Sequence, residues 1–377
     1  AYHGSLWLTY YYSQKARCGV QFFIKSNIMN TDVFQQLLRT RGETCLSIVV
    51  PTHEVSRERR NDKIEIKNAI HKAKEKLALH THAGEYKHLW DKLDELSATI
   101  DYLHNDKGLA LYISPSLAVK VIFPFEVEEK IVIDDQFEWS ELAYLVGLSL
   151  PYHLLLLSEK KVRLFSGQLN QLKEVHSSDF PDVFAETHEY AKPGRASSYA
   201  PQANVKGFEK DKSVMEEIRI HDYFRVVDQH LHKESHDQSP IIVAAPIEEL
   251  GIFDQVTHHK DRIAARIHGN YTHKSEGELG ELCFPHMVDH ITRLNEQRVK
   301  DFTEAIGYGK GMQDIREIVK AAREGRVRSL LMEQNYHNRD YDINELLCDV
   351  YDHKGEVVVM HQHALGSLPG LVAILRY

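Results

Sequence analysis

One segment of this chain carries the residue types that bind RNA. Between Tyr190 and Lys212, five basic residues stand against two acidic ones, and three aromatic residues are interleaved with them. Positive charges bind phosphates and aromatic rings stack on bases, so the segment is typical of a surface for single-stranded or folded RNA. A solvated, mobile loop is the alternative. The candidate RNA-binding residues are Lys192, Arg195, Tyr199, Lys206, Phe208 and Lys210.

A second basic cluster lies in residues 54–76, where eight basic residues stand against five acidic ones. It includes Arg57, Arg59, Arg60 and Lys67. This excess indicates a modest RNA-facing patch. A solvated helix whose charges pair at i,i+4 is an equally good interpretation.

The 24 histidines raise the question of a metal site. His286 and His290 stand four residues apart on a predicted helix, which places both imidazoles on one face. A metal site needs three or four convergent ligands, and no His-Glu-x-x-His or Cys/His spacing supplies them. No glycine loop of the Walker or dinucleotide type occurs either. We therefore expect no metal and no cofactor, and we assign no catalytic residue.

Strand and helix patterns alternate along the chain and must position these residues. An apolar strand at 45–50 stops at Pro51, and a helix follows with Ile66, Ile70, Ala73 and Leu77 on one face. A second helix is expected at about 85–104. Strands are expected at 154–157, 162–165 and 169–175, with a turn at Ser166-Gly167, before a helix at 213–234, a strand at 241–245 and helices to about 300.

These patterns predict an α/β (α+β) fold with three consecutive α/β domains. The predicted ranges are 29–148, 149–300 and 301–377, and the middle one contains the long loop 176–212. Residues 1–28 are rich in aromatics and lack clear periodicity. We interpret them as an expression remnant or an over-extended reading frame, with a docking aromatic arm as the alternative.

Bulk properties narrow the class of protein. The chain has 377 residues, which favours two or three domains, and a net charge of −9, so any RNA contact must come from local basic patches. Its four cysteines form no Cys-x-x-Cys pair, which fits a reducing compartment. No apolar run approaches the ~20 residues of a membrane span. We expect a cytoplasmic protein with neither a membrane nor DNA among its partners.

The ordered motifs resemble those of a known family. The strand, basic loop and helix carrying Glu65-Ile66-Lys67-Asn68 are similar to the decoding domain of archaeal and eukaryotic class-1 release factors, whose helix carries Asn-Ile-Lys-Ser. The stretch from Ala322 to Leu331 and the ending Glu356–Tyr377 resemble their third domain. From Met29 onward, the chain is identified as a member of the bacterial archaeo-eukaryotic release-factor-like family, the relatives of class-1 release factors and of Pelota.

This resemblance implies a protein that occupies the ribosomal A site as a tRNA does. Its middle domain would lie near the peptidyl-transferase centre, and its third domain would be like the kink-turn-binding ribosomal proteins. The implied partners are the ribosome, through rRNA, and a translational GTPase. The implied decoding-like residues are Ile66, Lys67 and Asn68 with Arg57, Arg59 and Arg60, although both flanks of the Ile-Lys pair differ from the release-factor motif.

The resemblance also predicts a catalytic Gly-Gly-Gln loop, and this chain contains no such tripeptide. The nearest string, Ser166-Gly167-Gln168, stands where a hairpin turn is expected. The 176–212 loop, which holds the corresponding place, has Pro201 before Gln202, and this proline stiffens the backbone. Peptidyl-tRNA hydrolysis is therefore not supported by a motif.

Three hypotheses follow. The first is a tRNA-mimicking translation factor that acts in ribosome rescue or hibernation. The second is a peptidyl-tRNA hydrolase that uses a divergent 176–212 loop. The third is an RNA- or protein-binding adaptor that works away from the ribosome.

Overall fold

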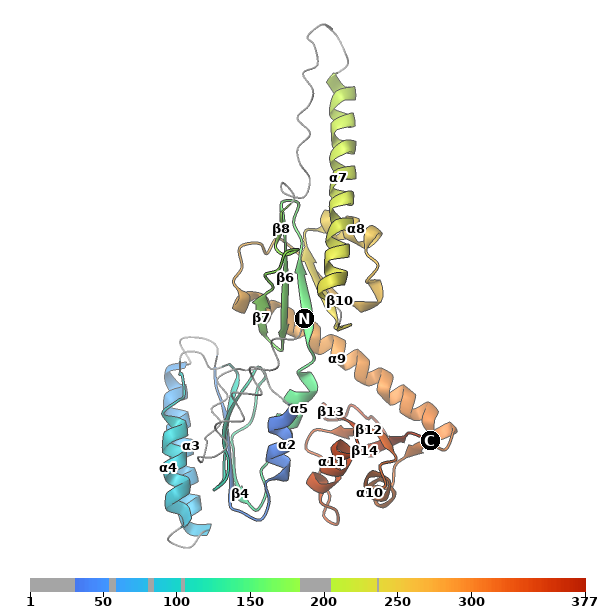
Figure 1. Cartoon of the computed structure of the whole chain (residues 1–377). Helices are drawn as coiled ribbons and strands as arrows, with labels where there is room; N and C mark the ends of the chain where they lie inside the picture. Colours follow the sequence, from blue (N-terminus) through green and yellow to red (C-terminus); the bar gives the residue numbers. More distant parts are fainter. Residues whose placement is uncertain (1–30, 54–58, 81–84, 103–105, 184–204, 236) are drawn as a thin grey trace. The chain divides into compact units, whose positions relative to one another are not determined.

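The computed structural model describes residues 31–53, 59–80, 85–102, 106–183, 205–235 and 237–377 (Figure 1). Its contacts divide the chain into two compact units. Unit 1 combines the residues up to Gly147 with Asn295–Tyr377, and unit 2 is Leu148–Leu294. The predicted mixed α/β fold is confirmed, because helices cover β-sheets in both units.

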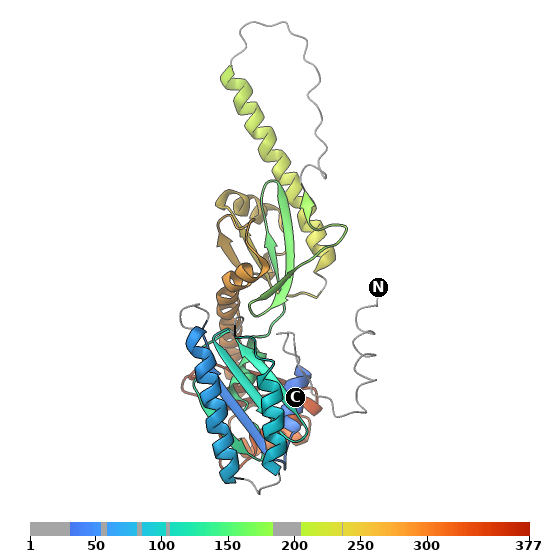
Figure 2. The same cartoon turned by 90° about the vertical axis from the view of Figure 1, so that its left-hand side faces the viewer.

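The first sheet of unit 1 is antiparallel, with the strand order β3-β2-β1-β4. Its helices α3 and α4 lie side by side on one face (Figure 2). Apolar residues spaced along α3, among them Ile66, Ala73 and Leu77, are buried against that face together with Leu89 and Leu93 of α4. The elements are α2 (Thr31–Arg39), β1 (Cys45–Pro51), α3 (Arg59–His80), α4 (Glu85–Ser97), β2 (Gly108–Ile113), β3 (Ala118–Phe123), β4 (Lys130–Asp134) and α5 (Ser140–Leu148).

The second sheet of unit 1 has the order β11-β14-β12-β13, in which only β12 and β13 are parallel. Aspartates cap its two helices: the Asp314 carboxylate accepts from the Arg316 backbone, and that of Asp342 from Asn344 and Glu345. The elements are β11 (Gly311–Met312), α10 (Ile315–Arg323), β12 (Val327–Glu333), α11 (Ile343–Asp352), β13 (Glu356–Met360) and β14 (Leu371–Leu375).

Unit 2 is a mixed sheet with the order β10-β9-β5-β6-β7, and the short β8 pairs with β6. Strands β5, β9 and β10 are parallel, whereas β6 and β7 continue the sheet antiparallel. The elements are β5 (Tyr152–Leu156), β6 (Lys161–Gln168), β7 (Gln171–Glu174), β8 (Asp182–Val183), α7 (Val205–Glu234), β9 (Ile241–Ala245), α8 (Ile247–Val256), a 3₁₀ turn (Lys260–Arg262), β10 (Ile263–His268) and α9 (Glu276–Gly307).

Both faces of the unit 2 sheet are covered, so its central strands are apolar on both sides. On β5, Leu155 packs with α7 and α8, while Leu154 and Leu156 pack with α9. This alternation follows from the two-residue period of a strand. It explains why the sequence is continuously apolar from Leu154 to Leu156.

The structure corrects several predicted boundaries. The helix expected at 85–104 ends at Ser97, and the helix expected at 213 begins at Val205. Residues 263–268, expected to be helical, form the strand β10, which pairs parallel with β9 at the edge of the sheet. Helix α9 runs through the boundary predicted at 300/301.

The three-domain division stays a prediction. Each predicted segment has a sheet of its own, while contacts join the first and last segments in unit 1. Edge-on packing of the Phe34 ring against Trp139 and Tyr351 is one such contact. In the described residues, no helix is both long and apolar enough to cross a membrane.

Candidate functional site

The predicted RNA-binding segment divides into two parts. Lys192, Arg195 and Tyr199 lie outside the described residues. Lys206, Phe208 and Lys210 lie in the first turns of α7, so the prediction of a loop reaching residue 212 was wrong. The loop interpretation missed this helix start because Gly207 and the mixed charges hide the apolar periodicity at the helix end. Binding of RNA by these residues stays a prediction.

The Ser166-Gly167-Gln168 string belongs to strand β6, and the turn lies three residues later than expected, at Leu169-Asn170. Leu169 takes the left-handed conformation there, with φ 54°. Gly167 is required for a different reason: a β-carbon on it would come 1.9 Å from the Gln171 carbonyl oxygen. The amide of Gln168 donates to the Ser149 carbonyl oxygen at 3.1 Å. These three residues are therefore held in a sheet rather than presented on a catalytic loop.

The decoding-like motif lies on α3, and its members differ in exposure. The Ile66 side chain is completely buried beneath the helix, so it cannot contact a partner, whereas Lys67 and Asn68 are exposed. Arg57 lies outside the described residues, and Arg59 and Arg60 open the helix. Among the six predicted residues, Lys67 and Asn68 have described side chains that are exposed and can contact a partner.

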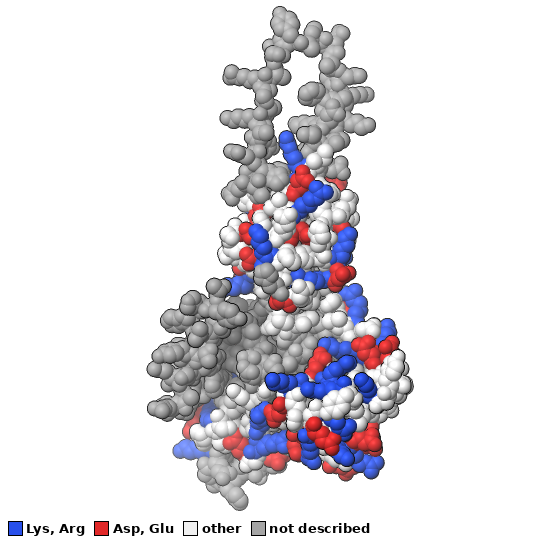
Figure 3. All heavy atoms as spheres, turned by 45° about the vertical axis from the view of Figure 1, so that its right-hand side comes forward, with Lys and Arg blue, Asp and Glu red and all other residues white. Residues whose placement is uncertain are grey.

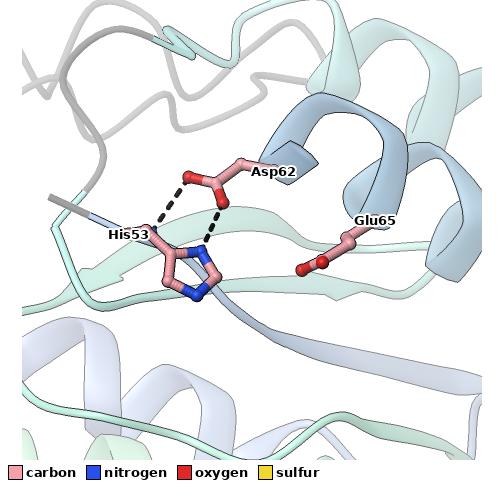
Figure 4. A group of neighbouring side chains, drawn as sticks. All are labelled: His53, Asp62 and Glu65. Atoms are coloured by element: carbon pink, nitrogen blue, oxygen red, sulfur yellow. Dashed lines mark hydrogen bonds and ion pairs between the residues drawn. The ribbon is translucent and has the colours of Figure 1, made fainter. Parts of the chain in front are cut away.

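At the start of this motif, the structure brings together three side chains that the sequence analysis did not connect: His53, Asp62 and Glu65. His53 follows β1, while Asp62 and Glu65 lie on one face of the first turns of α3 (Figure 4). The buried Asp62 carboxylate accepts a hydrogen bond from the backbone N–H of His53 at 3.0 Å and lies 2.7 Å from its Nδ1. These bonds attach the end of β1 to the start of α3. No sequence spacing motif could have shown the cluster, because residues nine and twelve apart meet only when the strand and the helix pack.

In unit 2, a buried carboxylate organises several histidines. Asp228 of α7 accepts hydrogen bonds from Thr257 Oγ1 at 2.7 Å and from the His258 backbone N–H at 3.2 Å, and it lies 2.8 Å from His258 Nδ1. The His259 ring stacks on His232, with 5.7 Å between ring centroids. These contacts fix the connection between α8 and β10 on α7.

A polar cavity of about 480 Å³ lies within unit 1. It is lined by residues 132 and 134–140, from β4 to the start of α5, and by residues 337–344, which form a loop and the start of α11. Hydrogen bonds cross it from Asn344 Nδ2 to Gln136 Oε1 at 2.6 Å and from Trp139 Nε1 to Asn344 Oδ1. Arg41 pairs with Asp342 at 2.9 Å. These contacts make the cavity part of the joint between the first and last segments of the unit.

Basic and acidic side chains are interspersed on the face shown in Figure 3. In the last segment of unit 1, several arginines are engaged by neighbouring carboxylates, such as Arg298 with Glu356 at 2.7 Å and Arg326 with Glu324 at 2.7 Å. This agrees with the acidic net charge of the chain.

Comparison with known proteins identifies the class: the chain is a release-factor-like protein, as the sequence motifs predicted. Residues 151–326 match the model of bacterial archaeo-eukaryotic release factor family 3. This range takes in the sheet of unit 2, the 176–212 segment and α9. No curated protein matches the chain in sequence.

Several solved structures resemble the chain at low identity. A model of ribosome-bound archaeal Pelota with ABCE1 is 12% identical, covers 93% of this chain and 94% of its own, and has a TM-score of 0.39. Dom34 of S. cerevisiae is 13% identical, with 71% and 74% covered and a TM-score of 0.38. Archaeoglobus fulgidus Pelota is 15% identical, with 72% and 79% covered and a TM-score of 0.33.

Proposed function

We propose that this protein is a ribosome-associated translation factor that enters the A site as a tRNA mimic, in rescue or hibernation. The observation that carries the proposal is the match of residues 151–326 to a bacterial archaeo-eukaryotic release factor family. We propose three domains: a decoding-like domain at residues 29–148, a middle domain at 149–300 and a C-terminal domain at 301–377. The protein would act in the cytoplasm with a translational GTPase as a further partner.

The proposal that this protein occupies the A site without hydrolysing peptidyl-tRNA rests on unit 2. The chain contains no Gly-Gly-Gln, and its nearest string is paired along β6. Catalysis of ester hydrolysis needs groups preorganised around the developing oxyanion. Gln168 is not available for that role, because its amide is engaged by the Ser149 carbonyl oxygen.

Sedimentation with bacterial ribosomes tests the proposal. The full chain is mixed with vacant, stalled or stationary-phase 70S ribosomes and pelleted through sucrose at low and at high salt. We expect it in the ribosomal pellet at low salt and less of it at high salt, because released counterions drive such binding. Recovery only in the supernatant with all three ribosome preparations contradicts the proposal.

A release assay on the same ribosomes distinguishes occupancy from hydrolysis. With labelled peptidyl-tRNA in the P site, we expect no peptide release above that of buffer alone. Release at an elevated rate favours the hydrolase hypothesis with a divergent loop. Binding to naked RNA without binding to ribosomes favours the adaptor hypothesis.

A further inference from the structure

The cluster formed by His53, Asp62 and Glu65 offers one donor atom from each of three side chains, all within 4.8 Å of one another. Asp62 and Glu65 lie on α3, which packs on the sheet, and His53 lies two residues after the end of β1, a central strand of that sheet. The cluster therefore combines an imidazole nitrogen with two carboxylate oxygens on a stable framework.

The buried member of the cluster is held in place. Asp62 is fully buried in the first turn of α3, and both of its oxygens are engaged by His53. His53 is partly exposed, with 39% of its side chain accessible, so an ion from solvent can reach the imidazole. Figure 4 shows the Glu65 carboxylate directed toward the His53 ring.

The distances are close to those of a coordination shell. Ligand atoms bound at about 2.0–2.2 Å stand about 2.8–3.1 Å apart around a six-coordinate ion and about 3.3–3.6 Å apart around a four-coordinate ion. His53 Nδ1 and Asp62 Oδ1 share a hydrogen bond at 2.7 Å, and loss of the imidazole proton on metal binding frees both atoms to act as ligands. Glu65, which is partly exposed on the helix surface, can close the remaining gap by a rotamer change.

The charge of the cluster favours a cation. Within the described part of the chain, no lysine or arginine forms an ion pair with Asp62 or Glu65, although other α3 residues do pair, such as Lys72 with Glu129 at 2.7 Å. One nitrogen and two oxygen donors suit borderline divalent ions such as Zn²⁺ or Co²⁺ better than Mg²⁺, which prefers oxygen alone.

We propose that His53, Asp62 and Glu65 form a binding site for one divalent first-row transition-metal ion. The three side chains supply the protein ligands, and water completes the shell. The ion would attach the end of β1 to α3 beside Lys67 and Asn68. This inference is independent of ribosome binding, because its test uses the free protein.

Isothermal titration of the full chain, first freed of metal with a chelator, tests the site with Zn²⁺. Co²⁺ provides a second readout, since its visible absorption reports the ligand shell. We expect one tight equivalent in the wild type. Glu65→Gln and His53→Ala should weaken it by roughly 10- to 100-fold and alter the Co²⁺ spectrum.

A matched control comes from the same helix. His71 and Glu75 form an exposed imidazole–carboxylate pair at 3.4 Å, without a third ligand. His71→Ala and Glu75→Gln should leave the tight equivalent unchanged. Because Glu65 is partly exposed, Glu65→Gln keeps the fold even if His53→Ala disturbs it, and circular dichroism verifies this.

Two outcomes overturn the proposal. One is the absence of any tight equivalent in the wild type. The other is binding of equal strength and stoichiometry in the wild type and in folded Glu65→Gln, which would place the ion among the remaining histidines and leave the His53–Asp62 contact as a structural tether alone.

Discussion

Gly280 of α9 lies directly against Asn170 in the β6–β7 turn: a β-carbon at position 280 would come 1.8 Å from the Asn170 carbonyl oxygen. The Asn170 amide also donates to Glu281 Oε1 at 2.6 Å, and the Tyr152 hydroxyl donates to the Leu169 carbonyl oxygen at 3.0 Å. The helix and the turn are therefore fitted to each other through backbone, which cannot move aside as a side chain can.

Gly280→Ala should destabilise unit 2 by about 1–3 kcal/mol, because the added methyl group forces the turn away from the helix. Urea unfolding measures the loss. Gly251→Ala on α8 is the control, since a β-carbon there meets nothing within 4 Å. That change should stabilise the helix by about 0.5–1 kcal/mol. Equal effects of the two substitutions would contradict the close approach.

Removal of the Asp228 carboxylate should also destabilise unit 2. Asp228→Ala leaves Thr257 Oγ1 and the His258 backbone N–H without their acceptor, at a cost on the order of 2–3 kcal/mol. Asp222→Ala on the same helix removes only an exposed pair with Arg225 and should change stability by less than about 0.5 kcal/mol. Thermal unfolding measures the stability of the two variants. If Asp222→Ala loses as much stability as Asp228→Ala, the hydrogen bonds to Asp228 do not contribute specifically to the stability of unit 2.

Acid should weaken unit 2 through His259. Burial lowers the pKa of His259 below its ordinary value of 6.5, against the opposing charge of Asp228 and with a further contribution from Arg262. The folded chain therefore takes up this proton less readily than the unfolded chain. The resulting stability is fully present above pH 6.5 and is lost as the pH falls through the folded pKa.

The free energy of unfolding at about pH 7.5 and about pH 5.5, measured in urea, checks this dependence. In His259→Phe, which can keep the stacking on His232, the drop between the two pH values should be smaller than in the wild type. His273→Gln, at an exposed position, should leave the drop unchanged. An unchanged drop in His259→Phe would assign the effect to other histidines.

Lys67 should contribute to ribosome binding through its exposed charge. Lys67→Ala should weaken binding and reduce the slope of log affinity against log salt by about 1, as expected for one lost phosphate contact. Lys72→Ala removes the same charge from the same helix, but Lys72 is paired with Glu129 at 2.7 Å. Affinities measured over a salt series should fall for Lys67→Ala and change little for Lys72→Ala; equal slopes for wild type and Lys67→Ala would exclude this residue from the interface.

The sequence by itself determined the local elements and the class of the protein. Apolar periodicity fixed α3 through Ile66, Ala73 and Leu77, and the largely apolar stretches of β1, β5 and β9 marked buried strands. These signals depend on the spacing of neighbouring residues, which a sequence displays directly. The motif order also sufficed for the release-factor-like family, and the match of residues 151–326 confirmed it.

Only the tertiary structure decided where distant residues meet. Gly167 was interpreted as a turn glycine, yet it is needed because Gln171 approaches it inside a hairpin. Ile66 was interpreted as part of a decoding-like surface, yet the packing of α3 on the sheet buries it and exposes Lys67 and Asn68. His53 and Asp62 come together because β1 and α3 pack, and such a contact between elements leaves no periodic trace in the sequence.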